Sequence, residues 1–127
     1  MHITLETDYA IRIVEHLAKT NQKTDAKTIS ARTGVSIRFA LKILHKLVAN
    51  GVVKSYKGAK GGYMLANAPR ETNLRQVYEA VEGPYRLSRC VDADVPCTHE
   101  SAGLCPYYKV FDEISREVRQ KLEKTHF

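Results

Sequence analysis

The sequence predicts a mainly α-helical fold with one short β-hairpin, and three observations lead to this fold class. Apolar residues recur at helical spacing in several stretches, apolar residues flank a glycine-rich turn within residues 52–66, and a long amphipathic stretch follows residue 105. With 127 residues, the chain is long enough for one domain with a real core and too short for two.

The first helix is predicted over Leu5–Thr20, where one side carries Ala10, Ile13, Val14 and Leu17. The N-terminal sequence MHITLETDYAIR contains acids and no small-residue cleavage site, so it does not have the pattern of a signal peptide. No apolar run approaches the roughly 20 residues that a membrane span needs. We therefore expect a reducing, cytoplasmic environment.

Two helices joined by a glycine turn follow. The first is predicted over residues 25–32, with Asp25 as its N-cap and Gly34 at its end. The second begins after Ser36 and ends at Gly51, and its apolar residues at helical spacing are Ile37, Ala40, Leu41, Leu44, Leu47 and Val48. The residues on its free face are Arg38, Lys42, His45 and Lys46. This is the pattern of a helix-turn-helix, whose second helix lies in a DNA major groove.

A β-hairpin is predicted directly after the helix-turn-helix. Apolar residues flank its turn, with Val52, Val53 and Tyr56 before it and Tyr63, Met64 and Leu65 after it. Gly58, Gly61 and Gly62 permit backbone conformations that side chains forbid, and Lys57 and Lys60 give the tip positive charge. Such a hairpin is a wing, whose lysines lie over phosphates or a minor groove. A nucleotide-binding glycine loop is the alternative, but no Walker-type Gly-Lys-Ser/Thr sequence follows.

The charge of the chain is unevenly distributed. Residues 26–70 carry nine Lys or Arg residues and no Asp or Glu, whereas acids and bases nearly balance elsewhere. A folded segment whose charged residues are all basic has a positive electrostatic field, which indicates a polyanion as the partner. The alternative is a basic surface that has no partner. We therefore predict double-stranded DNA as the partner. The residues expected to contact it are Ser36, Arg38, Phe39, Lys42, Lys54, Lys57, Lys60, Gly61 and Tyr63.

The remaining helices have the pattern of packing and assembly elements. One is predicted over residues 72–82 and ends at Gly83, and another begins at Pro106. The second has a narrow apolar stripe that consists of Val110, Ile114, Val118 and Leu122. A small domain has little core left for this stripe, so we expect a second copy of the chain to cover it. The predicted organisation is a DNA-binding unit at residues 1–83, a cysteine-containing loop at residues 84–105 and a dimerisation helix at residues 106–127.

All three cysteines lie in one short segment, as Cys90, Cys97 and Cys105. In a reducing compartment, such an odd set is more typical of metal or cluster ligands than of a disulfide with one thiol left over. Thiolates hold ferric and ferrous iron well, and zinc with His99 as the fourth ligand is a further option. Three cysteines in one polar, charged loop are improbable as buried apolar residues.

A Cys-His enzyme is the rival class for this segment, with Cys97 or Cys105 as the nucleophile and His99 as the base. So short a loop supplies neither an oxyanion hole nor a substrate cleft, and the basic wing would have no purpose. We therefore predict a DNA-binding protein that is not an enzyme.

Four features together resemble one protein family. They are TDYAIR at residues 7–12, VSIRFALKILHKLVANGVVKS at residues 35–55, KGAKGGYMLA at residues 57–66, and three cysteines before a final long helix. The chain is similar to the Rrf-type winged-helix transcriptional regulators, and the cysteine triplet marks their iron-sulfur-binding branch. The resemblance covers nearly the whole chain. It implies a homodimer that binds a palindromic operator and carries one iron-sulfur cluster, 2Fe-2S or 4Fe-4S, per protomer.

The resemblance also implies ligands for the cluster. The three thiolates would come from Cys90, Cys97 and Cys105, which are spaced more widely than is typical of the family. In its nitric-oxide sensors an aspartate of the first helix reaches the cluster from the other subunit, and Asp8 stands at the matching place. Its iron-sulfur cluster regulators use a histidine where this chain has Tyr108, a poor ligand for iron. Asp8 is therefore the expected fourth ligand, and His99 is the alternative.

The implied function is that of a transcriptional regulator, a repressor or an activator, that senses redox, iron or nitric oxide status. Three thiolates and one weaker ligand leave one iron labile, which suits a sensor. The alternative is a DNA-binding regulator without a cluster, controlled by thiol-disulfide exchange or by zinc. Leu41 stands where the family's iron-sulfur cluster regulators have a glutamate in the recognition helix, so the operator sequence stays open.

Overall fold

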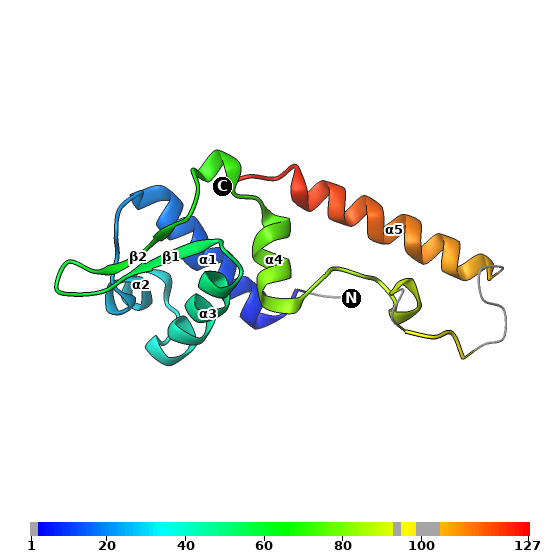
Figure 1. Ribbon diagram of the computed structural model, residues 1–127, viewed down its shortest axis with the longest axis horizontal. Helices are drawn as coiled ribbons and strands as arrows, with labels where there is room; N and C mark the ends of the chain where they lie inside the picture. Colours follow the sequence, from blue (N-terminus) through cyan, green and yellow to red (C-terminus); the bar gives the residue numbers. More distant parts are fainter. Residues whose placement is uncertain (1–2, 93–94, 99–104) are drawn as a thin grey trace.

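The computed structural model describes residues 3–92, 95–98 and 105–127 of the chain (Figure 1). Its elements in chain order are α1 (Leu5–Thr20), α2 (Ala26–Thr33), α3 (Ile37–Ala49), β1 (Val53–Tyr56), β2 (Gly62–Leu65), the short helix η1 (Pro69–Glu71), α4 (Leu74–Glu82), the short helix η2 (Arg89–Val91) and α5 (Pro106–Glu123). The two strands pair antiparallel, with Val53 opposite Leu65 and Tyr56 opposite Gly62. The predicted fold, mainly helical with a hairpin wing and a long C-terminal helix, is confirmed.

Local hydrogen bonds explain where the helix-turn-helix begins and ends. The Asp25 carboxylate accepts the N–H of Thr28 at 2.8 Å, and the Ser36 hydroxyl oxygen accepts the N–H of Phe39 at 3.4 Å. Gly34 ends α2 with φ 72°, a left-handed conformation that L side chains rarely adopt. The turn between α2 and α3 therefore follows from Gly34 and the Ser36 cap, and Asp25 fixes the start of α2.

The core lies where α1, α2, α3 and α4 meet. The largest fully buried side chains include Ile13, Leu17, Ile29, Ile43, Leu44 and Leu47. Val53 and Leu65 of the hairpin join the same cluster, which fixes the wing to the helices. Burial of each such side chain stabilises the fold by roughly 1.5–3 kcal/mol. The predicted inward side of α1 is confirmed in full.

Two details differ from the sequence predictions. Ile37 and Leu41, expected to face the core, are 44% and 45% exposed. The buried side of α3 is instead made by Ala40, Ile43, Leu44 and Leu47. The apolar arc of this helix is wider than the core it covers, so residues at the margin stay in solvent. In addition, α4 begins at Leu74 rather than at residue 72, because Asn73 forms a capping box with Gln76.

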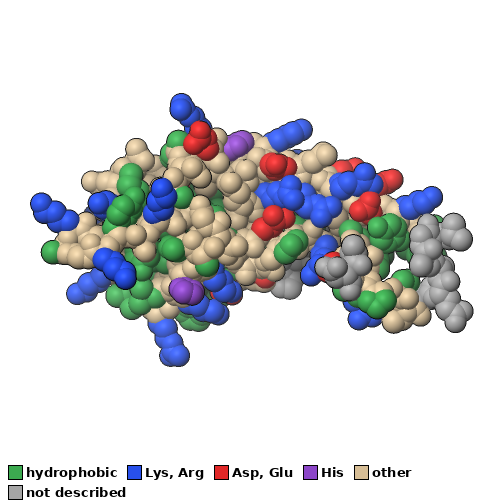
Figure 2. All heavy atoms as spheres, viewed as in Figure 1, with side chains coloured by type: hydrophobic (Ala, Val, Ile, Leu, Met, Phe, Trp, Pro, Cys, Tyr) green, Lys and Arg blue, Asp and Glu red, His purple; other side chains and the backbone are tan. Residues whose placement is uncertain are grey.

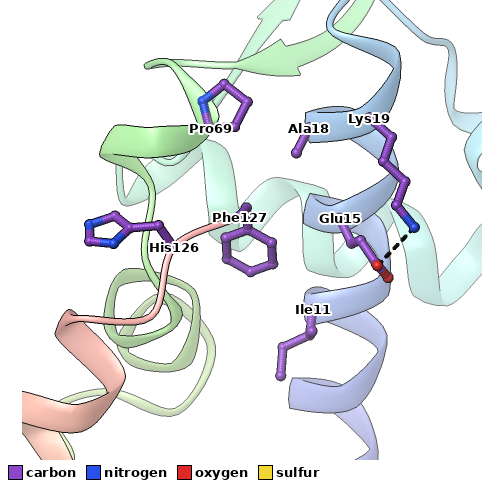
Figure 3. Close-up of a pocket in the computed structure, with 7 residues that line it drawn as sticks. All are labelled: Ile11, Glu15, Ala18, Lys19, Pro69, His126 and Phe127. Atoms are coloured by element: carbon purple, nitrogen blue, oxygen red, sulfur yellow. Dashed lines mark ion pairs between the residues drawn. The ribbon is translucent and has the colours of Figure 1, made fainter.

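The residues after α5 run back along α1 and α4. The Leu74 N–H donates to the Thr125 carbonyl at 2.9 Å, and the Phe127 N–H donates to the Thr72 carbonyl at 3.1 Å. Figure 3 shows the Phe127 ring turned toward α1 near Ile11, at the side of an open pocket of about 480 Å³. These contacts fix the C-terminal end of α5 to the helical unit.

The rest of α5 is held less tightly. Ser115 is the one buried residue of this 18-residue helix, and Val110 is 50% exposed. Ile114, Val118 and Leu122 are only partly buried. Figure 1 shows α5 projecting away from the other helices, with its first turn at the far end. One protomer therefore covers the apolar stripe of α5 in part.

Candidate functional site

The N-cap and first turns of α3 present four of the nine predicted DNA-contacting residues to solvent. Ser36, Arg38, Phe39 and Lys42 are all exposed. The Phe39 ring packs edge-on against Tyr9 of α1, with 6.2 Å between the ring centroids. Arg38 and Lys42 are four residues apart and thus share one side of the helix. This side is free to enter a major groove.

Glu6 of α1 is a partner of α3 that the sequence did not reveal. Its carboxylate lies 2.8 Å from Lys46 Nζ and 3.5 Å from Lys42 Nζ. Hydrogen bonding by Lys46 outweighs the effect of burial and holds the pKa of Glu6 below its ordinary value. Lys46 also donates to the Val81 carbonyl at 3.4 Å, so it ties α3 to α1 and α4. Lys42 remains 57% exposed and available to a partner.

The wing carries the three predicted lysines on its exposed outer part. Lys54, Lys57 and Lys60 are all exposed, in β1 and in the turn that follows it. Gly58 has φ 97°, and a Cβ at Gly61 would collide with backbone atoms of the turn. The tip therefore requires glycine at both positions, and this tight turn holds the lysines away from the core.

The base of the wing is anchored to the segment between α1 and α2. The Thr24 N–H donates to the Tyr63 carbonyl at 2.9 Å, and the Tyr63 N–H donates to the Thr24 carbonyl at 2.8 Å. The Tyr63 side chain packs partly against the core. Tyr63 is one of the predicted DNA contacts, and in the structure it fixes the wing to the rest of the protein. Its contact with DNA stays a prediction.

Lys23 extends the basic surface beyond the range recognised in the sequence. Its Nζ lies 4.2 Å from the centroid of the Tyr56 ring at the end of β1, a cation–π contact. The lysine precedes the acid-free stretch, so charge counting did not include it. Figure 2 shows Lys and Arg side chains projecting around the wing end, while most of the visible acidic side chains lie nearer α5.

The three cysteines lie in and beside the loop that precedes α5. Cys90 is half-buried in η2, with its Sγ 3.1 Å from the Ser88 hydroxyl, and Cys97 is exposed. Cys105 is half-buried and directly precedes the first turn of α5. All three thiols are free of disulfides. His99, the alternative ligand, falls outside the described residues.

Residues 84–92 are docked onto α4 and α5. The Leu87 N–H donates to the buried Ser115 hydroxyl at 2.9 Å, and Arg119 donates to the Tyr85 carbonyl at 3.3 Å. The Tyr85 ring packs edge-on against Tyr78 of α4, with 5.5 Å between the ring centroids. A change at Cys90 would therefore act on both helices, because the backbone just before it is bonded to them.

Asp8 lies on a different element from the three cysteines. It belongs to the first turns of α1, where its carboxylate is paired with Arg12 at 2.8 Å. Figure 1 shows α1 and the η2 region at separate places in the molecule. The role of Asp8 as a ligand of a cysteine-bound group stays a prediction.

These residues have the right chemistry for an iron-sulfur cluster, but in the part of the chain that the structure describes they are not gathered around one point. Three cysteines within one short segment, none of them in a disulfide, supply three of the four protein ligands that such a cluster takes. However, among residues 3–92, 95–98 and 105–127, no three Cys, His, Asp or Glu side chains are gathered as a metal site. The donor set fits the group, and its members would have to converge to hold it.

Comparisons with known proteins agree with this architecture. The family model described as "Rrf2: Iron-dependent Transcriptional regulator" matches residues 3–127. An rrf2-like helix-turn-helix transcriptional regulator of Rhodobacter capsulatus is 32% identical over 121 residues, which cover 88% of this chain and 80% of that protein. The transcriptional regulator NsrR of Bacillus licheniformis is 28% identical over 96 residues, which cover 74% of this chain and 67% of that protein.

A solved structure is also similar over nearly the whole chain. It is that of CymR, the global cysteine regulator of B. subtilis, with a TM-score of 0.76 and 25% identity over 99% of this chain and 92% of that one. In the part of this chain that the structure describes, no helix is long and apolar enough to cross a membrane. The family consists of DNA-binding transcriptional regulators rather than enzymes, which confirms the prediction of a non-enzymatic protein. The chain belongs to the Rrf2 family of winged-helix transcriptional regulators.

Proposed function

We propose that this protein is a homodimeric, cytoplasmic repressor whose affinity for its operator is controlled by an iron-sulfur cluster. The observation that carries the proposal is the position of three cysteines, none of them in a disulfide, in and beside the segment that links the winged-helix unit to α5. The description of the family as iron-dependent supports iron as the metal. A reducing compartment keeps such thiols available as ligands.

At the DNA end, Arg38 and Lys42 would contact base edges, while Lys57 and Lys60 would contact phosphates. Replacement of Arg38 by Ala should cost about 1–3 kcal/mol of binding free energy and relax the sequence preference. The Lys60→Ala variant should weaken binding to all sequences alike and lower the salt slope by about one. Titrations of operator and random DNA at several salt concentrations measure both. Equal effects of the two variants on both DNAs would contradict the assigned roles.

Dimerisation would place two recognition helices on the two halves of a palindrome. The partly covered apolar stripe of α5, with Val110 half exposed, supports a helix of a second copy as the cover. The same arrangement would bring Asp8 of one protomer toward the cysteine segment of the other.

The cluster would be held by Cys90, Cys97 and Cys105, with Asp8 of the second protomer as the fourth ligand. When bound, it supplies iron that reacts with oxygen or nitric oxide. A carboxylate is a harder and weaker ligand for this iron than a thiolate, so Asp8 would mark the reactive corner. Release of the cysteines would then act on α4 and α5 through the backbone that the Ser115 side chain holds.

The choice between Asp8 and His99 can be tested by reconstitution without oxygen. The Asp8→Ala variant should assemble a cluster with an altered visible spectrum and an altered rate of reaction with nitric oxide. The His99→Ala variant should match the wild type in both, and it is the control for loss of an uninvolved side chain. The opposite pattern would place the fourth ligand inside the cysteine loop.

A thiol-based regulator is the second candidate. Cys97 is exposed, and the chain is similar to CymR, which is named a cysteine regulator. Such a protein would be isolated colourless and without metal, and mild oxidation would form a disulfide that mass spectrometry detects. Zinc held by the cysteines and His99 would also give a colourless protein, but metal analysis would find about one zinc per chain.

A further inference from the structure

Two large apolar side chains stand in solvent on the recognition helix. Ile37 and Leu41 are both nearly half exposed, although their chemistry favours burial. They are four residues apart, so they lie one above the other on the surface of α3. The pair forms an apolar step at the start of the helix, on the part that enters a groove.

The flank of α3 that carries this step is free, whereas the opposite flank is occupied by α1. Phe39 packs against Tyr9, and Lys46 is paired with Glu6, on the side that faces α1. Arg38 lies beside the apolar step, since it follows Ile37 directly and precedes Leu41 by three residues. A ligand that meets Arg38 must therefore also meet the two apolar side chains.

We propose that Ile37 and Leu41 contact the C5-methyl groups of thymines in the major groove and thereby help to set the operator sequence. This inference rests on the proposed function, in which α3 reads base edges. Thymine is the base that presents a methyl group in the major groove of unmodified DNA, and apolar side chains recognise it by contact. The half-site should then hold thymine next to the base pair that Arg38 contacts.

The charge around the step favours DNA over a protein as the occupant. Residues 26–70 contain no acid, and Arg38, Lys42 and the wing lysines are exposed around the helix. A polyanion neutralises this field, whereas an apolar protein surface would leave the cations beside it unpaired. Burial of a methyl group against Leu41 adds sequence preference to an affinity that the cations supply.

The test compares thymine with uracil, which differ only by the methyl group. An operator is first selected from a random double-stranded DNA library with the wild-type protein, purified without oxygen. Each thymine of a half-site is then replaced by deoxyuridine, and binding is titrated with the wild type and with Leu41→Ala, Ile37→Ala and Lys57→Ala. The last is the control, because Lys57 lies on the exposed wing turn, away from the apolar step.

Removal of the critical methyl should weaken wild-type binding about fourfold per half-site, the effect of one buried carbon group. The variant that lacks its contact, Leu41→Ala or Ile37→Ala, should bind both DNAs equally, while Lys57→Ala should bind both more weakly and keep the fourfold difference. If replacement of thymine by uracil left the affinity of the wild type unchanged at every position, the inference would be overturned. The proposal that the protein binds DNA would still stand. Equal sensitivity of all variants would also overturn the inference. Failure to select any sequence would overturn the proposed function together with it.

Discussion

The winged-helix unit and the C-terminal helix are stabilised in different ways. In the unit formed by α1 to α4, every helix contributes fully buried or nearly buried apolar side chains to one shared core. In α5, one residue of 18 is buried, and that residue is the polar Ser115. The first region therefore has a hydrophobic core of its own. The second is held by a few hydrogen bonds and keeps its apolar stripe partly open, which is what an assembly element requires.

A charge placed in the apolar stripe of α5 should have the largest effect. The Ile114→Asp variant should be monomeric and should lose about a hundredfold or more in operator affinity, because two half-sites can no longer be bound at once. The matched control is Gln120→Asp, at an exposed position of the same helix. Analytical ultracentrifugation and operator titration measure both effects. A wild type that sediments as a monomer would refute the dimer.

A second prediction concerns one residue type at two positions of α3. Leu44 is fully buried, so Leu44→Ala should lower the free energy of unfolding by about 2–5 kcal/mol. Leu41 is half exposed, so Leu41→Ala should change it by no more than about 0.5 kcal/mol. Urea unfolding of the two variants decides the matter. Similar losses in both would mean that the margin of α3 is packed in solution.

The hydrogen bond between the two regions gives a smaller effect. The Ser115→Ala variant removes the acceptor of the Leu87 N–H, and a part-buried donor without a partner should cost about 1–3 kcal/mol. Amide exchange at Leu87 should accelerate as well. The control is Thr125→Ala, which removes an exposed hydroxyl that donates to a carbonyl at the end of α5. Unchanged exchange at Leu87 would mean that Ser115 does not hold the cysteine segment.

The smallest effect concerns the pH dependence of stability. The pKa of Glu6 is lower in the folded protein than its ordinary value of 4.5. Its contacts with Lys46 and Lys42 therefore stabilise the fold fully when the pH of the solution is above 4.5. This contribution, at most about 1 kcal/mol, should disappear as pH falls through the lower folded pKa. Unfolding of Glu6→Gln from pH 7 to pH 3 should therefore show a shallower loss than the wild type.

The matched control for this prediction is Glu15→Gln. Glu15 also lies on α1 and is paired with Lys19, but both side chains are more than half exposed. It should leave the pH profile of the wild type almost unchanged. Identical profiles for the Glu6 and Glu15 variants would show that the contact between α1 and α3 adds no stability.

The sequence was sufficient to predict the elements that local chemistry specifies. Asp25, Gly34 and Ser36 mark helix ends by the conformations and hydrogen bonds that they favour, and all three do so in the structure. Residues fixed by contacts between distant elements could not be found in this way. Glu6 meets α3 only after folding, and nothing in the residues around it indicates a partner.

In the candidate site too, local features could be predicted from the sequence, whereas features that depend on distant elements could not. The exposed lysines of the wing follow from charge and glycine content, which are local properties. The exposure of Ile37 and Leu41 depends on how wide the core beneath α3 is, and periodicity alone does not give that width. The proposed fourth ligand, Asp8 of a second protomer, depends on an assembly that neither the sequence nor one protomer determines.

The most direct test of the central claim is analysis of the protein purified without oxygen, by visible absorption and by assay of iron and acid-labile sulfide. A cluster-binding regulator should be isolated as a brown protein with iron and sulfide in matching amounts. Both should be lost in each of Cys90→Ala, Cys97→Ala and Cys105→Ala, together with a change in operator affinity. A colourless wild type, or three cysteine variants that all keep their metal, would contradict the claim that this segment holds an iron-sulfur cluster.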